Sequence, residues 1–131
     1  MYYFTALTTL AALSFYASLS YEVAKARGRY GVKAPATTGD AHFERIYRVQ
    51  MNTLEWLVVF LPCLWLFAFY VSDLGAAALG AVWIFGRYLY KQAYVAAPET
   101  RGFGFAVQAT AAALLLIGTA LDIVLRLAMG D

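Results

Sequence analysis

Four runs of apolar residues constrain this chain more than any other feature of its sequence. Residues 1–21, 56–72 and 102–121 contain no charged side chain, and residues 74–86 form a shorter uncharged run. An α-helix rises 1.5 Å per residue, so about 20 such residues cross a hydrocarbon core roughly 30 Å thick. Of the 131 residues, 63% are hydrophobic and 14% are charged, whereas about a quarter of a soluble domain is charged. We therefore expect the chain to lie in a membrane.

The third run is too short to cross alone, because residues 74–86 give only about 20 Å of helix. The helix must continue through Arg87, Tyr90 and Tyr94 until Pro98 ends it. A polar group at membrane depth is costly unless it faces the bundle interior, so these side chains are expected to point inward. The sequence predicts one all-α domain, a four-transmembrane-helix bundle with spans at about 2–24, 42–71, 74–97 and 101–126.

The connections and their charges predict an orientation. Gly28 to Asp40 is expected to form a loop, and Ser72 and Asp73 a tight turn. Four crossings then place both termini and this turn on one side of the membrane. Nine of the ten basic residues fall on the other side, which the positive-inside rule makes cytosolic: Lys25, Arg27, Arg29, Lys33, Arg45, Arg48, Arg87, Lys91 and Arg101. Because the first basic residues follow the first apolar run, we expect that run to be retained and not cleaved as a signal peptide.

Several site classes are disfavoured by composition. Cys63 is the single cysteine and lies inside an apolar stretch, so it forms neither a disulfide within the chain nor a metal cluster. His42 has no partner at metal-ligand spacing, and no metal is expected. A net charge of +2 is too small to indicate nucleic-acid binding.

Polar residues gather on one stripe of the second helix and one stripe of the third. They recur every three or four residues, which places them on one helix face. The second helix carries Arg45, Arg48, Asn52 and Glu55, the third carries Arg87, Tyr90 and Tyr94, and Arg101 begins the fourth at the same level. Two simpler interpretations stay open: the charges cross-link the bundle as ion pairs, and the tyrosines belong to the interfacial aromatic belt.

The residue types on these stripes indicate the chemistry of a ligand. Arginines pair with carboxylates, a carboxylate such as Glu55 suits an ammonium group, and the amide of Asn52 offers a donor and an acceptor. A small zwitterion with additional carboxylates would satisfy this set.

Residues 43–55, FERIYRVQMNTLE, resemble the signature of the MAPEG family, the membrane-associated proteins of eicosanoid and glutathione metabolism. Arg87, Tyr90, Gln92, Tyr94 and Arg101 stand at the spacing seen in that family, and the four-span layout covers nearly the whole chain. The resemblance implies a homotrimer of four-helix subunits. It also implies that glutathione, as co-substrate, binds between neighbouring subunits in a site open to the cytosol and to the bilayer.

The resemblance also assigns roles to individual residues. Arg101 is expected to activate the glutathione sulfur as the catalytic residue. The expected glutathione ligands are Arg48, Asn52, Glu55, Tyr90 and Tyr94, with Arg27 and Gln50 contributed by the adjacent subunit. Trp56 stands where leukotriene-forming members have a tyrosine, so its indole N–H would replace a hydroxyl contact. The run from Arg101 to Gly104 is closer to the broad-specificity members, which favours small electrophiles or lipid hydroperoxides as partners.

The sequence therefore predicts a membrane-bound glutathione transferase of detoxification type, with glutathione-dependent peroxidase activity as a second reaction. The alternative is a non-catalytic member that binds and presents lipids, like the five-lipoxygenase-activating protein. Arg101 and the polar stripe disfavour that alternative. A channel or transporter is a third class, but the polar groups are confined to one end of the bundle instead of tracking across it.

Overall fold

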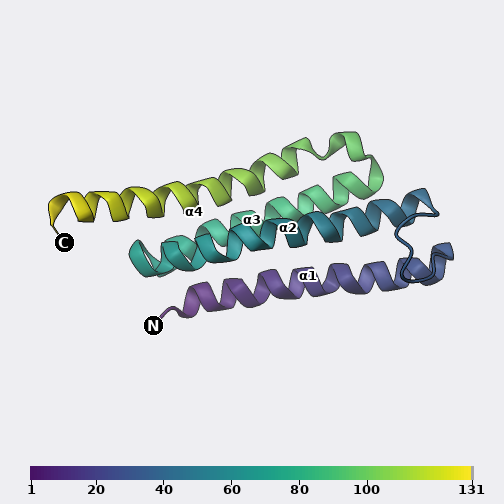
Figure 1. Ribbon diagram of the computed structural model, residues 1–131, viewed down its shortest axis with the longest axis horizontal. Coiled ribbons are helices and arrows are strands. Elements are labelled where there is room, and N and C mark those ends of the chain that lie inside the picture. The colour runs from purple at the N-terminus through teal and green to yellow at the C-terminus, as the bar shows by residue number, and fades with distance from the viewer. Residues whose placement is uncertain (131) are drawn as a thin grey trace.

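The computed structural model describes residues 1–130 and consists of four long helices lying side by side (Figure 1). They are α1 (Tyr3–Tyr30), α2 (Ala41–Tyr70), α3 (Asp73–Ala96) and α4 (Gly102–Met129), with a short 3₁₀ helix, η1 (Pro98–Thr100), between the last two. Within residues 1–130 there is no β-strand. The predicted all-α four-helix bundle is confirmed.

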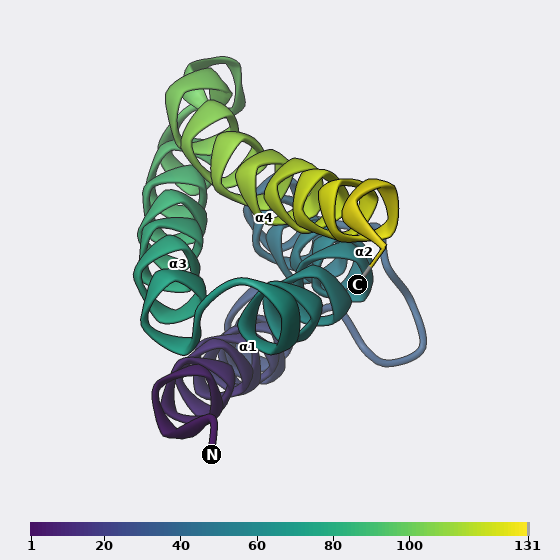
Figure 2. The same ribbon diagram turned by 90° about the vertical axis from the view of Figure 1, so that its left-hand side faces the viewer.

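The two ends of the bundle differ in what they contain. The first residues of the chain, the end of α4 and the α2–α3 turn lie at one end, and the α1–α2 loop and η1 lie at the other, as Figure 1 shows. Figure 2 views the bundle along its length and shows that the helices are not parallel. α4 runs obliquely away from α3 and crosses over α2. At the η1 end, α1 and α3 end and α2 and α4 begin, so all four helices contribute residues there.

Two of the helices, α2 and α4, are long and apolar enough to cross a membrane on length and composition. Large apolar side chains on their outer faces are exposed, among them Val58 at 70% and Leu121 at 58%. Exposed apolar surface of this extent fits a lipid environment. Four crossings by four helices, and the orientation of the bundle, stay predictions.

The first helix is longer than the sequence predicts. The expected loop from Gly28 begins only at Gly31, because α1 continues to Tyr30. A glycine inside a helix costs only about 1 kcal/mol, which the surrounding helix-forming residues outweigh. Gly31 takes the left-handed conformation at φ 71°, and the Val32 N–H bonds to the Arg27 carbonyl at 3.1 Å. Such a left-handed residue ends a helix in the usual way.

Each of the next two helices begins with a side-chain cap, within one residue of the start that the sequence predicts. Asp40 accepts hydrogen bonds from the backbone N–H groups of His42 and Phe43 at the start of α2. Ser72 accepts one from the Gly75 N–H at the start of α3. These caps satisfy N–H groups that have no partner within their own helix.

Two glycines allow α3 and α4 to approach very closely. A Cβ at Gly86 would lie 2.6 Å from the Gln108 nitrogen, and one at Gly104 would lie 2.4 Å from the Tyr90 nitrogen. No larger residue fits at either contact without displacing backbone. Small residues are typical of contacts between membrane helices for this reason. The close approach fixes the first turn of α4 against the part of α3 that carries Tyr90.

Candidate functional site

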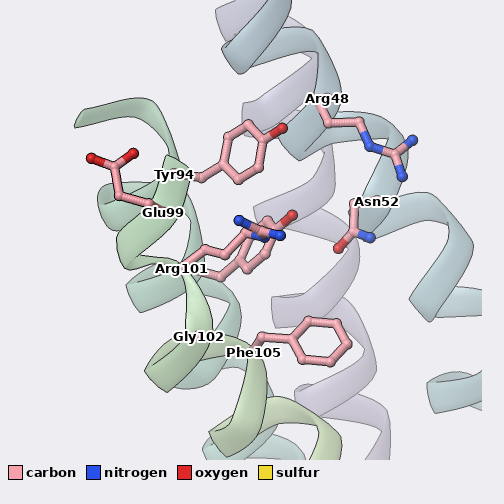
Figure 3. Close-up of a pocket in the computed structure, with 8 residues that line it drawn as sticks. Arg48, Asn52, Tyr94, Glu99, Arg101, Gly102 and Phe105 are labelled. Carbon is pink, nitrogen blue, oxygen red and sulfur yellow. The ribbon is translucent and has the colours of Figure 1, made fainter. Parts of the chain in front are cut away.

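A cavity of about 640 Å³ opens at the η1 end of the bundle, between α2, α3 and the start of α4. Its lining residues are Arg48 and Asn52 from α2, Tyr90 and Tyr94 from α3, and Glu99, Arg101, Gly102 and Phe105 from η1 and α4 (Figure 3). Five of the eight were candidate ligands or the candidate catalytic residue on sequence grounds. Residues separated by more than fifty positions thus share one cavity, and the structure brings both arginines of this set into it.

Arg87 lies behind the cavity and contacts two of its lining residues, Asn52 and Tyr90. Its side chain is fully buried, and its guanidinium donates to the Asn52 side-chain oxygen at 2.9 Å and to the Thr53 hydroxyl at 2.7 Å. The guanidinium carbon also lies 4.3 Å from the centre of the Tyr90 ring, within the range of a cation–π interaction. Because Arg87 uses the Asn52 oxygen, the NH₂ group of Asn52 is left to donate to a ligand.

The two tyrosines form an aromatic side to the cavity. The rings of Tyr90 and Tyr94 stack with centroids 5.5 Å apart, and Phe105 lies 6.3 Å from Tyr90. Tyr90 is only 3% exposed, whereas Tyr94 is half-buried. In Figure 3 the Tyr94 ring points across the cavity toward Arg48. Burial of Tyr90 disfavours the interpretation that it serves only in an interfacial belt.

Arg101 lies at the junction of η1 and α4, and its guanidinium reaches into the middle of the labelled residues in Figure 3. One of its nitrogens donates to the Pro98 carbonyl at 2.8 Å, which leaves the other donors of the guanidinium for a ligand. α4 begins at Gly102, so its N-terminal end lies at the cavity as well. A helix N-terminus carries partial positive charge, which adds to that of the arginine.

Glu55 and Trp56 lie next to the cavity without lining it. Glu55 accepts from Arg48 at 3.4 Å, and the side chains of this pair are 57% and 52% exposed. The Trp56 ring packs edge-on against Phe105, with centroids 5.5 Å apart. The Arg48–Glu55 pair is the kind of ion pair that the alternative interpretation expected, but it is exposed at the mouth of a cavity and does not cross-link helices.

Arg27 and Gln50 lie outside this cavity in the single chain. Arg27 donates to the carbonyl of Ala36 at 2.7 Å and to that of Val32, and so supports the α1–α2 loop. Gln50 donates to the Ser20 hydroxyl at 2.9 Å and so links α2 to α1. The role expected for both residues, in the site of an adjacent subunit, stays a prediction.

Arg45 shares the sequence stripe of Arg48 but has another function. It donates to the carbonyls of Val95 and Ala96, the last residues of α3. An arginine satisfies carbonyls that lack partners at a helix C-terminus and interacts favourably with the negative end of the helix dipole. Arg45 therefore cross-links α2 to the end of α3, as the simpler interpretation expected, but through backbone carbonyls and not through an ion pair.

Three lining residues were missed on sequence grounds: Glu99, Gly102 and Phe105. Phe105 stands four residues after Arg101, so the helical period of α4 could have indicated that both share one face. Glu99 lies in η1, whose path depends on the packing of α3 against α4, and no sequence signal identified it. Arg87 was expected to face inward, and it does, but its support of Asn52 was not anticipated.

Comparison with known proteins gives consistent matches. The model of the MAPEG family matches residues 5–121. A protein of Synechocystis sp. described as uncharacterized is 49% identical over 122 residues, 93% of this chain and 89% of that protein. Microsomal glutathione S-transferase 2 of Homo sapiens is 40% identical over 102 residues, 78% of this chain and 69% of that protein. Leukotriene C4 synthase of Bos taurus is 38% identical over 93 residues, 71% of this chain and 62% of that protein.

Proposed function

Because this chain belongs to the MAPEG family, we propose that it is a membrane-bound glutathione transferase whose site is the cavity at the η1 end. One observation carries the proposal: Arg48, Asn52 and Arg101 line the same cavity as Tyr90 and Tyr94. Glutathione transferase activity is named for the human relative. The two arginines suit the carboxylates and the thiolate of glutathione, and the carboxylate of Glu55 beside Arg48 suits its ammonium group.

The candidate ligands on α2 and α3 each have a role in this proposal. Arg48 pairs with one glutathione carboxylate, and the Asn52 NH₂ donates to another acceptor of the peptide. Glu55, exposed beside Arg48, accepts from the ammonium group. The Tyr94 hydroxyl bonds the glutathione backbone in this proposal, and Tyr90 forms the inner wall. Charge-assisted hydrogen bonds of this type are about twice as strong as neutral ones.

Arg101 is proposed to stabilise the glutathione thiolate. A free thiol has a pKa of about 8.5, so most of it is protonated at neutral pH, whereas the thiolate is the nucleophile. Lowering that pKa by about two units requires roughly 2.7 kcal/mol of preferential stabilisation of the thiolate. A guanidinium at the N-terminus of α4 is suited to supply it.

The reaction then needs no further cofactor. The thiolate sulfur attacks an electrophilic carbon, a C–S bond forms, and the leaving group departs with its electron pair. With a lipid hydroperoxide, the sulfur instead takes the distal oxygen and releases an alkoxide. A second glutathione then displaces water from the sulfenic acid and gives the disulfide. Phe105, which is exposed, and Trp56 offer an apolar approach for a hydrophobic partner from the bilayer.

Conjugation of an aryl halide by the purified protein tests the proposal. We expect glutathione-dependent product formation, and we expect Arg101→Ala to lower kcat at pH 7 by about 25-fold, because a two-unit rise from about 6.5 to 8.5 in the thiol pKa lowers the thiolate fraction by roughly that factor. The absorbance of bound thiolate should fall in the same variant. Lys33→Ala is the control, because Lys33 is exposed and lies outside the cavity.

Full activity in Arg101→Ala would remove the proposed mechanism. Calorimetric titration with glutathione separates the transferase from the lipid-presenting alternative. Saturable heat at millimolar glutathione is expected for the transferase, whereas a lipid-presenting protein should give none.

A further inference from the structure

A second cavity, of about 270 Å³, lies between α1, α2 and α3 on another side of the bundle. It is lined by Glu22, Lys25, Ala26, Arg29 and Tyr30 of α1, Ile46 of α2, and Lys91, Gln92 and Val95 of α3. Ile46 and Arg48 are two residues apart, so they project about 200° from each other around α2. No residue lines both this cavity and the candidate glutathione site. We call it the α1–α3 groove.

The α1–α3 groove has an excess of positive charge. Three cations line it, and its single carboxylate, Glu22, is paired with Lys91. Lys25 and Arg29 contact aromatic rings, at 5.5 Å from Tyr21 and 5.4 Å from Tyr30 respectively. Within residues 1–130 neither of these two cations forms an ion pair with a carboxylate. Both are exposed and free to bind an anion.

The base of the α1–α3 groove is apolar. Ala26 is buried, and Ile46 and Val95 are half-buried. A small soluble anion would leave this apolar surface in contact with water. A molecule with an anionic head and a hydrocarbon chain would cover both the cations and the apolar base, so the groove matches an amphipathic ligand.

The position of the groove along α1 points to the same ligand. The uncharged run of α1 ends at residue 21, and Lys25 lies about 6 Å further along the helix axis. If α1 crosses the membrane as proposed, Lys25 and Arg29 are at the depth of the lipid phosphates. Both project about 200° away from Arg27, the residue expected to face an adjacent subunit. The groove therefore faces lipid and not a neighbouring subunit.

We propose that the α1–α3 groove binds an anionic phospholipid, with Lys25 and Arg29 on its phosphate headgroup and an acyl chain along Ala26, Ile46 and Val95. This inference goes beyond the glutathione site, and it rests on the predicted crossing of α1 and on the predicted position of Arg27 toward an adjacent subunit. Each basic side chain near an anionic headgroup contributes about 1 kcal/mol, which corresponds to roughly five-fold in affinity.

Titration of the full-length protein in a neutral detergent, followed by native mass spectrometry, tests the proposal. Phosphatidylglycerol should bind saturably, and phosphatidylcholine with the same acyl chains should bind at least five-fold more weakly. Arg29→Gln should weaken phosphatidylglycerol binding about five-fold, and adding Lys25→Gln should weaken it about 25-fold. Lys33→Gln is the matched control. It removes one exposed positive charge at the same end of the bundle, outside the groove, and should change affinity less than two-fold.

Three outcomes would overturn the inference. Equal losses in Arg29→Gln and Lys33→Gln would mean general charge attraction. Equal affinity for the two lipids would mean that the groove does not recognise the headgroup charge. Displacement of phosphatidylglycerol by millimolar inorganic phosphate would mean a soluble-anion site. Glutathione titration of the same variants keeps the two proposals separate, because Arg29→Gln should leave glutathione affinity unchanged even where lipid binding is lost.

Discussion

Arg87 contacts two of the side chains that line the candidate glutathione site, Asn52 and Tyr90. A fully buried guanidinium in a membrane protein is costly unless its donors are satisfied. Arg87 meets this requirement partly through Asn52 and Thr53, and it lies over the Tyr90 ring. It does not line the cavity itself. Any effect of Arg87 on a ligand of the cavity must therefore pass through Asn52 and Tyr90, as expected of a positioning residue.

Arg87→Met should weaken glutathione binding, because Asn52 would lose the partner that fixes its amide. A hydrogen bond to a charged group contributes about 1.5–3 kcal/mol, so we expect KM for glutathione to rise at least ten-fold. Steady-state kinetics with varied glutathione measures this. Thr53→Val is the control, because it removes the other hydrogen bond of Arg87 without touching a lining residue. It should lower thermal stability and leave KM within about two-fold, and a KM rise equal to that of Arg87→Met would contradict the role.

The sequence predicted which side chains face inward better than it predicted what they contact. The spacing of Arg48 and Asn52 placed them on one helix face, and both line the cavity. Arg45 obeys the same spacing but bonds the end of α3, because helix periodicity fixes a direction around the axis and not the neighbour at each level. Glu99 could not be predicted, since its position depends on how η1 joins two packed helices.

The packing of α3 against α4 decides where Arg101 lies. Gly104 contacts the backbone at Tyr90 so closely that a Cβ would come within 2.4 Å of the Tyr90 nitrogen. The close contact is three residues from Arg101 and one from Phe105, in the first turn of α4. Any increase in the α3–α4 spacing would therefore widen the cavity on the side of Arg101.

Gly104→Ala should lower both stability and activity. Overpacking of this kind typically costs about 1–3 kcal/mol, and the displaced α4 would draw Arg101 away from the cavity. Thermal denaturation in detergent and the conjugation assay measure the two effects. Gly28→Ala is the matched control, because a Cβ there would meet nothing within 4 Å. Unchanged activity in a destabilised Gly104→Ala would mean that the spacing of the two helices does not set the position of Arg101.

Asp73 joins the starts of two helices at the opposite end of the bundle. Its carboxylate accepts from the backbone N–H groups of Phe4 at 3.2 Å and Thr5 at 2.8 Å, at the start of α1, while Asp73 itself begins α3. Partial desolvation raises the pKa of Asp73, but the hydrogen bonds from Thr5 and Phe4 outweigh it and lower the pKa below its ordinary value. The folded protein therefore prefers the ionised form.

The stability that Asp73 contributes should depend on pH. Because its pKa is lower in the folded state, the contribution is complete above the unfolded value of about 3.9 and is lost as pH falls through the folded value. The melting temperature of Asp73→Asn should thus lie below that of the wild type by a constant margin above about pH 5. The two should converge as the pH falls below about 4. A margin that does not shrink at all as the pH falls below about 4 would mean that Asp73 stabilises the bundle by means other than its charge.

The lengths of the apolar runs and the positions of the charges made the four-helix bundle predictable. The same two features do not determine the exact residue at which a helix ends. The apolar runs located all four helices, because a segment in lipid must satisfy its own backbone hydrogen bonds. They could not locate the end of α1, since Gly28 is tolerated on a helix surface and Gly31 ends the helix instead. The number of subunits is harder to predict from the sequence than a helix end. A helix face that contacts another subunit has the same apolar periodicity as one that faces lipid.

Subunit assembly is best tested by mixing variants. If glutathione binds between subunits, each site uses Arg101 of one subunit and Arg27 of its neighbour, so Arg27→Ala and Arg101→Ala should each inactivate alone. Co-expressed in equal amounts and assembled at random into closed rings, they should regenerate about a quarter of the sites. Activity per subunit in the mixture, relative to the wild type, measures this fraction.

The control for mixing pairs Arg101→Ala with Arg48→Ala. Both residues line the cavity of the same subunit, so no combination of these two chains restores an intact site, and activity should stay at the level of the single variants. Recovery in the Arg27 mixture but not in this one would require a site shared between chains, because only residues from different subunits can complement each other. Recovery in neither would place Arg27 in its own subunit, where its bond to the Ala36 carbonyl shapes the α1–α2 loop, and would leave the cavity complete within one chain.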